Sequence, residues 1–314
     1  NVGIFASGQA YEQMIMKMRV HPSEEVRNYA DMILEELRKV IPSFLKRVDV
    51  ENRGVEWSNY MRKNQIETAK YVSKNLDKIP SIKNDEVDDD VNLVEWESDA
   101  QRKIAASCLY SSSQKSLQEL NKFAANLSES EIKEILLNYS GTRSNRRHKP
   151  GRAFENSFYT FDILSDYGAF RDLQRHRLMT IEWQRMSPNL GFDMPEEVNK
   201  SGLMDKCLGL VNASVDLYSK LDKEFPDIKE YALLFGHKIR YSITLNVRQA
   251  FHLIELRTAK QGHVSYRNIC QKMHMLIKDK AGHNVFHELM SFVDHEDYEL
   301  QRLDSEIKQS GKEN

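Results

Sequence analysis

The segment KIRYSITLNVRQAFHLIELR, residues 238–257, carries the clearest secondary-structure pattern in the chain. Its first half alternates apolar and polar residues, which is typical of a strand with one buried face. The apolar members are Ile239, Tyr241, Ile243 and Leu245. Asn246 has the side chain of a helix N-cap, and the apolar residues after it recur with helical spacing. They are Val247, Ala250, Phe251 and Ile254. The segment therefore predicts a strand that leads directly into a buried helix.

Strand and helix patterns continue on both sides of this segment. Strands are expected in NLVEW (92–96) and in the aromatic, β-branched stretch AFENSFYTFDI (153–163). Helices are expected near 98–108, 114–126, 129–138, 167–186, 201–224 and 264–279. The helix over 167–186 would carry RDLQRHRLMTIEWQRM and end before Pro188.

The N-terminal part of the chain has only helical patterns. Two helices are predicted within residues 8–41, separated by a turn that contains Pro22, and a polar helix follows over roughly 55–78. A proline and a run of acidic residues then interrupt the apolar periodicity. We therefore expect three parts: a helical segment over 1–80, an acidic linker over 81–90 and a domain over 91–314.

An internal repeat links the two ends of the chain. GQAYEQMIMKMR (8–19) aligns without a gap with NVRQAFHLIELR (246–257), and a short polar turn and a second helix follow each copy. Any two amphipathic helix pairs can be matched to some degree, which is the alternative explanation. The chain also starts at Asn1 without methionine or a signal peptide. We expect residues 1–80 to be the end of an earlier, truncated copy.

Composition excludes several classes of protein. The 314 residues include 45 Lys and Arg against 47 Asp and Glu, so no overall basic charge favours nucleic acid. No apolar run approaches the roughly 18 residues that a membrane helix needs. The three cysteines are too few and too far apart for a disulfide framework, which favours a reducing, cytoplasmic location. The motifs GxGxxG, GxSxG and CxxC and the P-loop are all missing.

A first group of candidate functional residues gathers positive charge in a short stretch. Arg171, Arg175, His176 and Arg177 fall within seven residues, and only Asp172 offsets them. On the predicted helix, Arg171 and Arg175 would share a face. Guanidinium groups bind phosphate through paired hydrogen bonds, so the group is suited to a phosphate or diphosphate. The alternative is a solvated surface face that pairs with nearby acids.

The helix after Asn246 carries a second group. Asn246 would lie at the helix N-terminus, whose free N–H groups attract anions. Arg248 and His252 are four residues apart on the polar face, and Arg257 ends the helix. A terminal arginine can also serve only as a partner of the helix dipole.

Two other segments give weaker signals. His283 and His287 have a spacing that could share a metal ion with His295 or Glu296, but HExxH is missing and the segment looks exposed. We therefore predict no metal ligands. The basic loop from Arg143 to Arg152 lacks interleaved aromatic residues, so a mobile active-site loop or a solvated loop is favoured over a nucleic-acid contact.

Taken together, three segments resemble the flavin-dependent thymidylate synthases, also called thymidylate synthase complementing proteins. They are FENSFYTFDI (154–163), RDLQRHR (171–177) and NVRQAFHLIELR (246–257), and their order and spacing hold across roughly 91–290. The resemblance implies an α+β fold in which helices flank a curved antiparallel or mixed sheet, here preceded by a helical segment. The alignment of residues 1–50 with the end of the same family implies a tandem-repeat protein.

The resemblance also implies a reaction and its cofactors. The expected activity is reductive methylation of dUMP to dTMP, with FAD as hydride carrier, methylenetetrahydrofolate as carbon donor and NADPH as reductant. The expected partners are a dUMP-type nucleotide and further copies of the chain in a cytoplasmic homo-oligomer, without membrane and without nucleic acid.

Roles for individual residues follow from the same resemblance. Arg257 would hold and polarise the uracil as the catalytic residue. The residues expected to bind FAD are Thr160, Arg175, His176, Arg177, Asn246, Arg248 and His252. The residues expected to bind the nucleotide are Arg171, Arg185 and Ser187.

Six positions depart from the family pattern. Arg185 and Ser187 stand in exchanged order, and Glu182-Trp183 replaces the usual Asn-Glu pair. Asn156 stands where the family has histidine, and Glu230 falls near a position where it has arginine. Most of these changes concern the nucleotide side of the site. The alternative hypothesis is therefore a catalytically degenerate domain with a role in assembly or nucleotide binding.

Overall fold

The computed structural model describes residues 3–79, 90–298 and 307, and the chain divides into two compact units. The first unit contains Asn1–Glu86 and Asp216–Tyr231, and the second contains Val87–Val215 and Ala232–Asn314. Helix α10 (Met204–Glu224) contributes to both. The predicted division at residues 80 and 91, with its explanation as a repeat, stays a prediction. The predicted linker lies outside the described residues except for Asp90.

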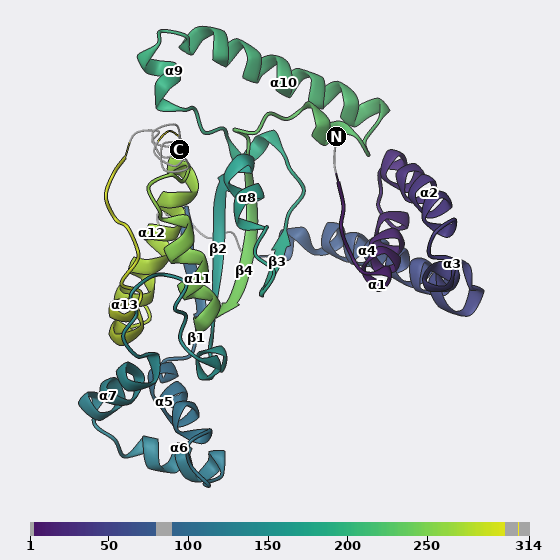
Figure 1. Ribbon diagram of the computed structural model, residues 1–314. Helices are drawn as coiled ribbons and strands as arrows, with labels where there is room; N and C mark the ends of the chain where they lie inside the picture. The colour runs from purple at the N-terminus through teal and green to yellow at the C-terminus, as the bar shows by residue number, and fades with distance from the viewer. Residues whose placement is uncertain (1–2, 80–89, 299–306, 308–314) are drawn as a thin grey trace. The chain divides into compact units, whose positions relative to one another are not determined.

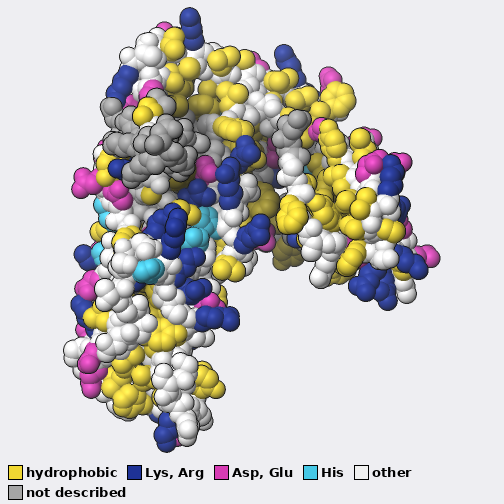
Figure 2. All heavy atoms as spheres, in the orientation of Figure 1, with side chains coloured by type: hydrophobic (Ala, Val, Ile, Leu, Met, Phe, Trp, Pro, Cys, Tyr) yellow, Lys and Arg dark blue, Asp and Glu magenta, His cyan; other side chains and the backbone are white. Residues whose placement is uncertain are grey.

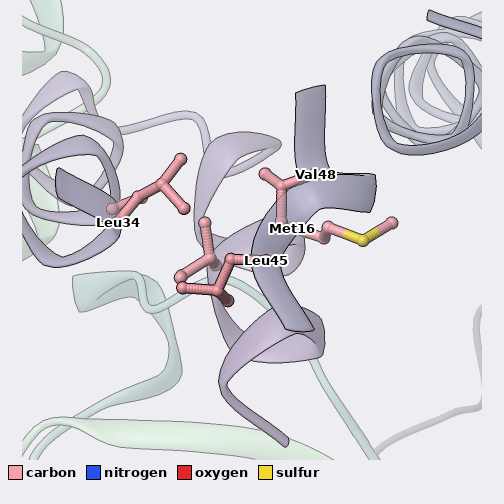
Figure 3. Close-up of a cluster of buried hydrophobic side chains, with 6 residues drawn as sticks. Met16, Leu34, Leu45 and Val48 are labelled. Atoms are coloured by element: carbon pink, nitrogen blue, oxygen red, sulfur yellow. The ribbon is translucent and has the colours of Figure 1, made fainter. Parts of the chain in front are cut away.

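The first unit is helical, as its sequence pattern predicts. Its main helices are α1 (Gly8–Arg19), α2 (Glu24–Arg38), α3 (Pro42–Leu45) and α4 (Glu56–Asn75), with short turns at Lys46–Asp49, Glu51–Val55, Leu76–Lys78 and, further along the chain, Lys229–Ala232. Figure 3 shows its small core, in which Met16, Leu34, Leu45 and Val48 converge from α1, α2, α3 and the following turn. Ile15 and Ala30 complete this cluster.

The second unit is built on one antiparallel sheet. Its strands are β1 (Val91–Trp96), β2 (Phe158–Asp166), β3 (Met179–Trp183) and β4 (Lys238–Asn246), and their order in the sheet is β1-β2-β4-β3. The three strands expected from sequence, β1, β2 and β4, are confirmed. Every pairing is antiparallel, so the sheet is antiparallel rather than mixed.

The two faces of this sheet differ in polarity because alternate residues of a strand point to opposite sides. Tyr159 and Phe161 of β2 and Tyr241 and Ile243 of β4 are buried on one face. Helix α12 (Val264–Asp279) packs against this face, and α11 (Val247–Arg257) lies against α12, as Figure 1 shows. The other face carries polar, half-exposed side chains such as Asp162. The predicted α+β class is thereby confirmed.

The junction between β4 and α11 follows the sequence prediction closely. The Oδ1 atom of Asn246 accepts a hydrogen bond from the backbone N–H of Gln249 at 2.8 Å, as an N-cap does. The residues expected to face the core from α11, among them Ala250 and Phe251, are fully buried.

Helices α5 (Ala100–Tyr110), α6 (Leu117–Ala125) and α7 (Glu129–Ser140) cluster near one end of the sheet (Figure 1). Ser116 and Ser128 start α6 and α7 with capping boxes, in which serine and glutamate side chains satisfy free N–H groups. The remaining elements are short: a turn at Arg152–Glu155, α8 (Tyr167–Leu173), a turn at Pro188–Leu190, α9 (Glu196–Lys200) and α13 (Asn284–Leu289).

The predicted helix over 167–186 is wrong. Helix α8 ends at Leu173, and Met179–Trp183 forms strand β3 instead. The strand forms because pairing with β4 gives its backbone hydrogen bonds that the local periodicity does not reveal, and because Thr180 and Ile181 are β-branched. Arg171 and Arg175 therefore do not share a helical face.

Among the residues that the structure describes, no helix has both the length and the apolar character needed to cross a bilayer.

Candidate functional site

Arg257 and His176 form the centre of the candidate site, although 81 positions separate them in sequence. Arg257 ends α11, and its Nε donates a hydrogen bond to Nε2 of His176 at 3.0 Å. Its Nη2 donates to the backbone oxygen of Asp172 at 2.5 Å, and its Nη1 lies 3.5 Å from the Asp172 carboxylate. The ring of Tyr266 lies 5.3 Å from the guanidinium carbon. The guanidinium is thus held in one orientation.

Strand pairing brings these two segments together. His176 lies in the loop between α8 and β3, and Arg257 lies on the helix that follows β4. Because β3 pairs with β4, Met179 stands opposite Leu245, two residues before α11 begins. The strand that sequence analysis missed is therefore the element that positions the site.

His176 is a neutral hydrogen-bond acceptor at physiological pH. Its side chain is 8% exposed, and burial together with the positive charges of Arg257 and Lys149 and with nearby His252 lowers its pKa to about 4. An arginine can only donate hydrogen bonds, so Nε2 of His176 must carry a lone pair. The positive charge at this contact therefore belongs to Arg257.

Further cations surround this pair. The ring centroid of His252 lies 5.5 Å from that of His176. The pKa of His252 is lowered, first by burial and then by the charges of Lys149, Arg146, Arg257 and Arg248. The pKa of Lys149 is itself lowered by burial and by the charges of Arg248 and Arg146. We call Arg146, Lys149, His176, Arg248, His252 and Arg257 the cationic cluster. In Figure 2, Lys, Arg and His side chains gather in the part of the second unit where α8 and α11 lie.

The carboxylates that contact this cluster neutralise only part of its charge. Arg257 is 3.5 Å from Asp172, and Arg248 is 3.4 Å from Glu155. Arg248 also donates from Nε to the backbone oxygen of Pro150 at 2.7 Å, which ties the basic loop to α11. Mutual repulsion among cations is relieved by an anion, so the cluster is suited to phosphate groups.

Two predicted cofactor residues lie beside the cluster with exposed guanidinium groups. Arg175 is 3.6 Å from Asp172, and its side chain is 66% exposed. Arg177 is exposed and, within the part of the chain that the structure describes, forms no ion pair. Both are therefore available to an anionic ligand.

The basic loop is anchored at its start rather than mobile or merely solvated. Arg143 donates two hydrogen bonds to the carboxylate of Glu255, at 2.7 and 2.6 Å, and a third to the backbone oxygen of Leu289 at 2.6 Å. Its guanidinium also lies 5.2 Å from the rings of Phe251 and Phe292. Sequence analysis missed Glu255 and Lys149. A carboxylate among apolar positions of α11 was the available signal for Glu255.

Three other predicted ligand residues make contacts away from the cluster. Thr160 lies on the half-exposed face of the sheet, where its Oγ1 is 3.0 Å from that of Thr244. Arg171 lies over the ring of Phe235 at 5.1 Å, and Ser187 accepts a hydrogen bond from the backbone N–H of Asn189 at 3.2 Å. None of these contacts involves the cationic cluster. Arg185 is exposed just after β3.

Of the three histidines of the C-terminal segment, His283 is buried and His287 half-buried, contrary to the expectation of an exposed segment, whereas His295 is exposed. His283 is 1% exposed, and its Nδ1 lies 2.7 Å from the hydroxyl of Tyr159. The ring of His287 stacks on that of His274 with centroids 3.9 Å apart, and Nε2 of His295 lies 2.8 Å from Nδ1 of His274. Across residues 3–79, 90–298 and 307, no group of three or more His, Cys, Asp or Glu side chains could hold a metal ion.

We expect the buried histidines to make the protein sensitive to acid. Burial is the main cause that lowers the pKa of His274 to about 3 and of His176 to about 4, whereas the unfolded chain takes up these protons near pH 6.5. The unfolded state therefore binds more protons below pH 6.5, so the stability present above that pH is lost as the pH falls toward 3. Each of these histidines lowers the free energy of unfolding by up to about 1.4 kcal/mol for each pH unit below 6.5.

Urea unfolding at pH 7.5, 6.5 and 5.5 measures this loss. His274→Gln should flatten the dependence of the unfolding free energy on pH, whatever its effect at pH 7.5. An equally steep dependence in the variant would contradict the assignment to His274.

A family model matches much of the second unit. Residues 92–281, more than half of the chain, match the family model described as thymidylate synthase complementing protein. The family inferred from the sequence is therefore confirmed, while the tandem repeat stays a prediction.

Curated relatives extend over both units. The chain is 31% identical over 315 residues to a UPF0159 protein of Chlamydia pneumoniae, covering 98% of this chain and 57% of the relative. It is 27% identical over 314 residues to a UPF0159 protein of Thermoplasma acidophilum, covering 99% and 60%. The chain thus spans less than two thirds of the length of these relatives.

Among solved structures, the chain is similar to a UMP/dUMP methylase, PolB from Streptomyces cacaoi, bound with 5-bromo-dUMP. The TM-score is 0.50 at 15% identity, over 65% of this chain and 94% of the methylase. At that identity the likeness supports the fold alone.

Proposed function

Because the chain belongs to the thymidylate synthase complementing protein family, we propose that its second unit takes part in the reductive methylation of dUMP to dTMP. The proposed co-reactants are FAD, methylenetetrahydrofolate and NADPH. The observation that supports this proposal most is the cationic cluster around Arg257. It combines an oriented guanidinium with an excess of positive charge, and it contains Arg248, His252 and Arg257, which the family resemblance assigns to flavin and nucleotide.

The charges of the proposed ligands fit this cluster. A phosphate monoester carries about 1.5 to 2 negative charges at pH 7, and FAD contains a diphosphate. Arg175 and Arg177 have exposed guanidinium groups, and the half-buried Arg248 adds a further positive charge. The guanidinium groups of Arg175, Arg177 and Arg248 therefore suit FAD, which the resemblance also assigns to His176, Asn246 and His252. When bound, FAD supplies the hydride. Thr160 gains no support as a flavin ligand from its contacts within the sheet.

Arg257 has the geometry of a group that stabilises charge. His176 and the backbone oxygen of Asp172 occupy its Nε and Nη2, while Nη1 is engaged only at 3.5 Å. Nη1 can therefore donate to an oxygen of the uracil and stabilise negative charge on the ring. Because the guanidinium is already oriented, little reorganisation is needed when that charge develops. We assign the nucleotide phosphate to Arg185, Ser187 and Arg171, as the resemblance implies.

A degenerate domain is the second candidate function. Asn156, which replaces the family's histidine, donates to the backbone oxygen of Ala153 at 3.1 Å, a contact that only stabilises its own turn. Glu182 is exposed on β3, where its charge would repel a phosphate. In this alternative the domain binds a nucleotide or supports assembly and performs no chemistry.

One experiment separates the two candidates. The full-length protein is incubated with dUMP, FAD, methylenetetrahydrofolate and NADPH, and dTMP is quantified. We expect dTMP to form only when all four are present, and we expect the purified protein to retain added flavin. Retained flavin or bound dUMP without dTMP would establish the degenerate domain. Failure to bind either ligand would exclude the enzyme and the nucleotide-binding form of the alternative, and would leave only a role in assembly. Light scattering on the same sample tests the predicted homo-oligomer.

Charge removal in the cluster should weaken ligand binding. The double variant Lys149→Gln with Arg248→Gln removes two cations that face the site, so we expect dUMP or FAD to bind about 10- to 100-fold more weakly. The loss should shrink as salt is added, since salt screens the attraction.

A matched variant controls for the change in net charge. Lys115→Gln with Lys122→Gln also removes two lysine charges, from around α6, and should leave both affinities within about twofold. Equal losses in the two double variants would contradict a specific site. Calorimetric titration at 50 and 200 mM salt measures these affinities.

A further inference from the structure

Gln249, which no motif singled out, extends the contact between Arg257 and His176. Its side chain is 4% exposed, and the atom placed as its amide nitrogen, Nε2, lies 3.4 Å from Nδ1 of His176, whose Nε2 accepts the hydrogen bond from Arg257. A glutamine three residues after an N-cap commonly reaches back to the cap. Here the amide of Gln249 lies beside His176 instead, so its hydrogen-bonding partner is the histidine ring and not the N-cap.

Hydrogen-bond donors and acceptors along this chain allow one arrangement. Arg257 can only donate, so Nε2 of His176 carries the lone pair. A neutral imidazole has a single N–H, which must then be on Nδ1. An N–H at Nδ1 requires an acceptor, and the amide group that can supply one is the Oε1 of Gln249. Amide nitrogen and oxygen are distinguished by the hydrogen-bond network, and here the network requires the oxygen to face His176.

We propose that Gln249 is a positioning residue that fixes the tautomer of His176 and thereby the orientation of Arg257. In the other tautomer, an N–H on Nε2 would face the N–H of Arg257, and the contact would be lost. The guanidinium could then rotate away from the position in which Nη1 faces the ligand. The effect on nucleotide binding rests on the proposed function, whereas the tautomer of His176 does not.

Two substitutions of Gln249 distinguish the role of its oxygen from a packing role. Gln249→Leu keeps the approximate size of the side chain and removes both amide groups. Gln249→Glu keeps an acceptor oxygen at the same reach. Gln271→Leu is the matched control. Gln271 lies on α12, away from His176, and its side-chain amide donates to the backbone oxygen of Asp294.

The first measurement needs no ligand. Nitrogen-15 NMR of the histidine rings in the full chain reports which ring nitrogen carries hydrogen, and His176→Asn identifies the resonance. We expect the Nδ1–H tautomer in the wild type, in Gln249→Glu and in Gln271→Leu, and a substantial Nε2–H population in Gln249→Leu. A pure Nδ1–H tautomer in Gln249→Leu would overturn the proposal.

The second measurement is dUMP affinity. We expect Gln249→Leu to bind about tenfold more weakly, and Gln249→Glu and Gln271→Leu to remain within about threefold of the wild type. An equal loss of dUMP affinity in Gln249→Leu and Gln249→Glu would mean that Gln249 acts only through packing, and it would overturn the proposal. If the wild type binds no dUMP, the proposed function fails, while the NMR measurement still decides the tautomer.

Discussion

Replacing Arg257 with alanine should reduce dTMP formation about 100- to 1,000-fold. The structure orients Arg257 through His176 and Asp172 and leaves its Nη1 engaged only at 3.5 Å. Removing one preoriented donor from an active site typically costs that much in rate. Arg257→Lys keeps the charge but loses the contact with His176, so it should recover only a small part of the activity. Initial rates at saturating and limiting dUMP measure both effects.

Arg19 provides a matched control for Arg257. It ends α1, in the segment that aligns with 246–257, but its guanidinium is engaged with the carboxylates of Asp31 and Asp49 at 2.7 Å. Arg19→Ala should therefore leave the rate per folded molecule unchanged. An equal loss in both variants would contradict a catalytic role for Arg257.

A second measurement on Arg257→Ala needs no activity. The charge of Arg257 helps to hold the pKa of His176 at about 4, so its removal should raise that pKa toward the ordinary value. NMR titration of the His176 ring measures the shift. An unchanged pKa would mean that the contact between the two side chains does not form in solution.

The largest loss of stability is expected for Arg143→Met. Arg143 and Glu255 form a two-bond ion pair in which the side chains are 3% and 1% exposed. Methionine can occupy the space between Phe251 and Phe292, but the carboxylate of Glu255 would remain buried without its counter-ion. Breaking a buried pair in this way costs about 3–5 kcal/mol. Urea unfolding at neutral pH measures the loss.

Two further variants test that explanation. Arg152→Met removes an arginine from the same loop, but its side chain is 86% exposed in its pair with Glu155, so the free energy of unfolding should change by about 1 kcal/mol or less. The double variant Arg143→Met with Glu255→Leu removes both charges and should regain most of the lost stability. If the double variant is as unstable as the single one, the loss comes from packing and not from the unpaired charge.

Local sequence patterns predicted most of the secondary structure. The strand and helix of 238–257, the cap at Asn246 and the helices on either side depend on periodicity and capping, which act over a few residues. The residue types of the Arg-His-Arg segment and of α11 were enough to suggest an anionic ligand and the family. These predictions succeeded because the apolar residues that define them are buried in the structure as their spacing requires.

The errors occurred where distant contacts outweigh local preference. Residues 179–183 have a sequence compatible with a helix, but strand β4 offers them backbone partners and they form β3. Arg143 was predicted to belong to a mobile or solvated loop, but it forms a buried ion pair with Glu255, 112 residues further along the chain.

The sequence by itself determined most of the secondary structure, because periodicity and capping are properties of neighbouring residues, and its resemblance to known sequences indicated the family and the α+β class. Only the tertiary structure decided which of these residues meet. The pairing of β3 with β4 brings His176 to Arg257, and burial makes that histidine a neutral acceptor. Both effects depend on groups far apart in the chain, whose approach no local pattern records.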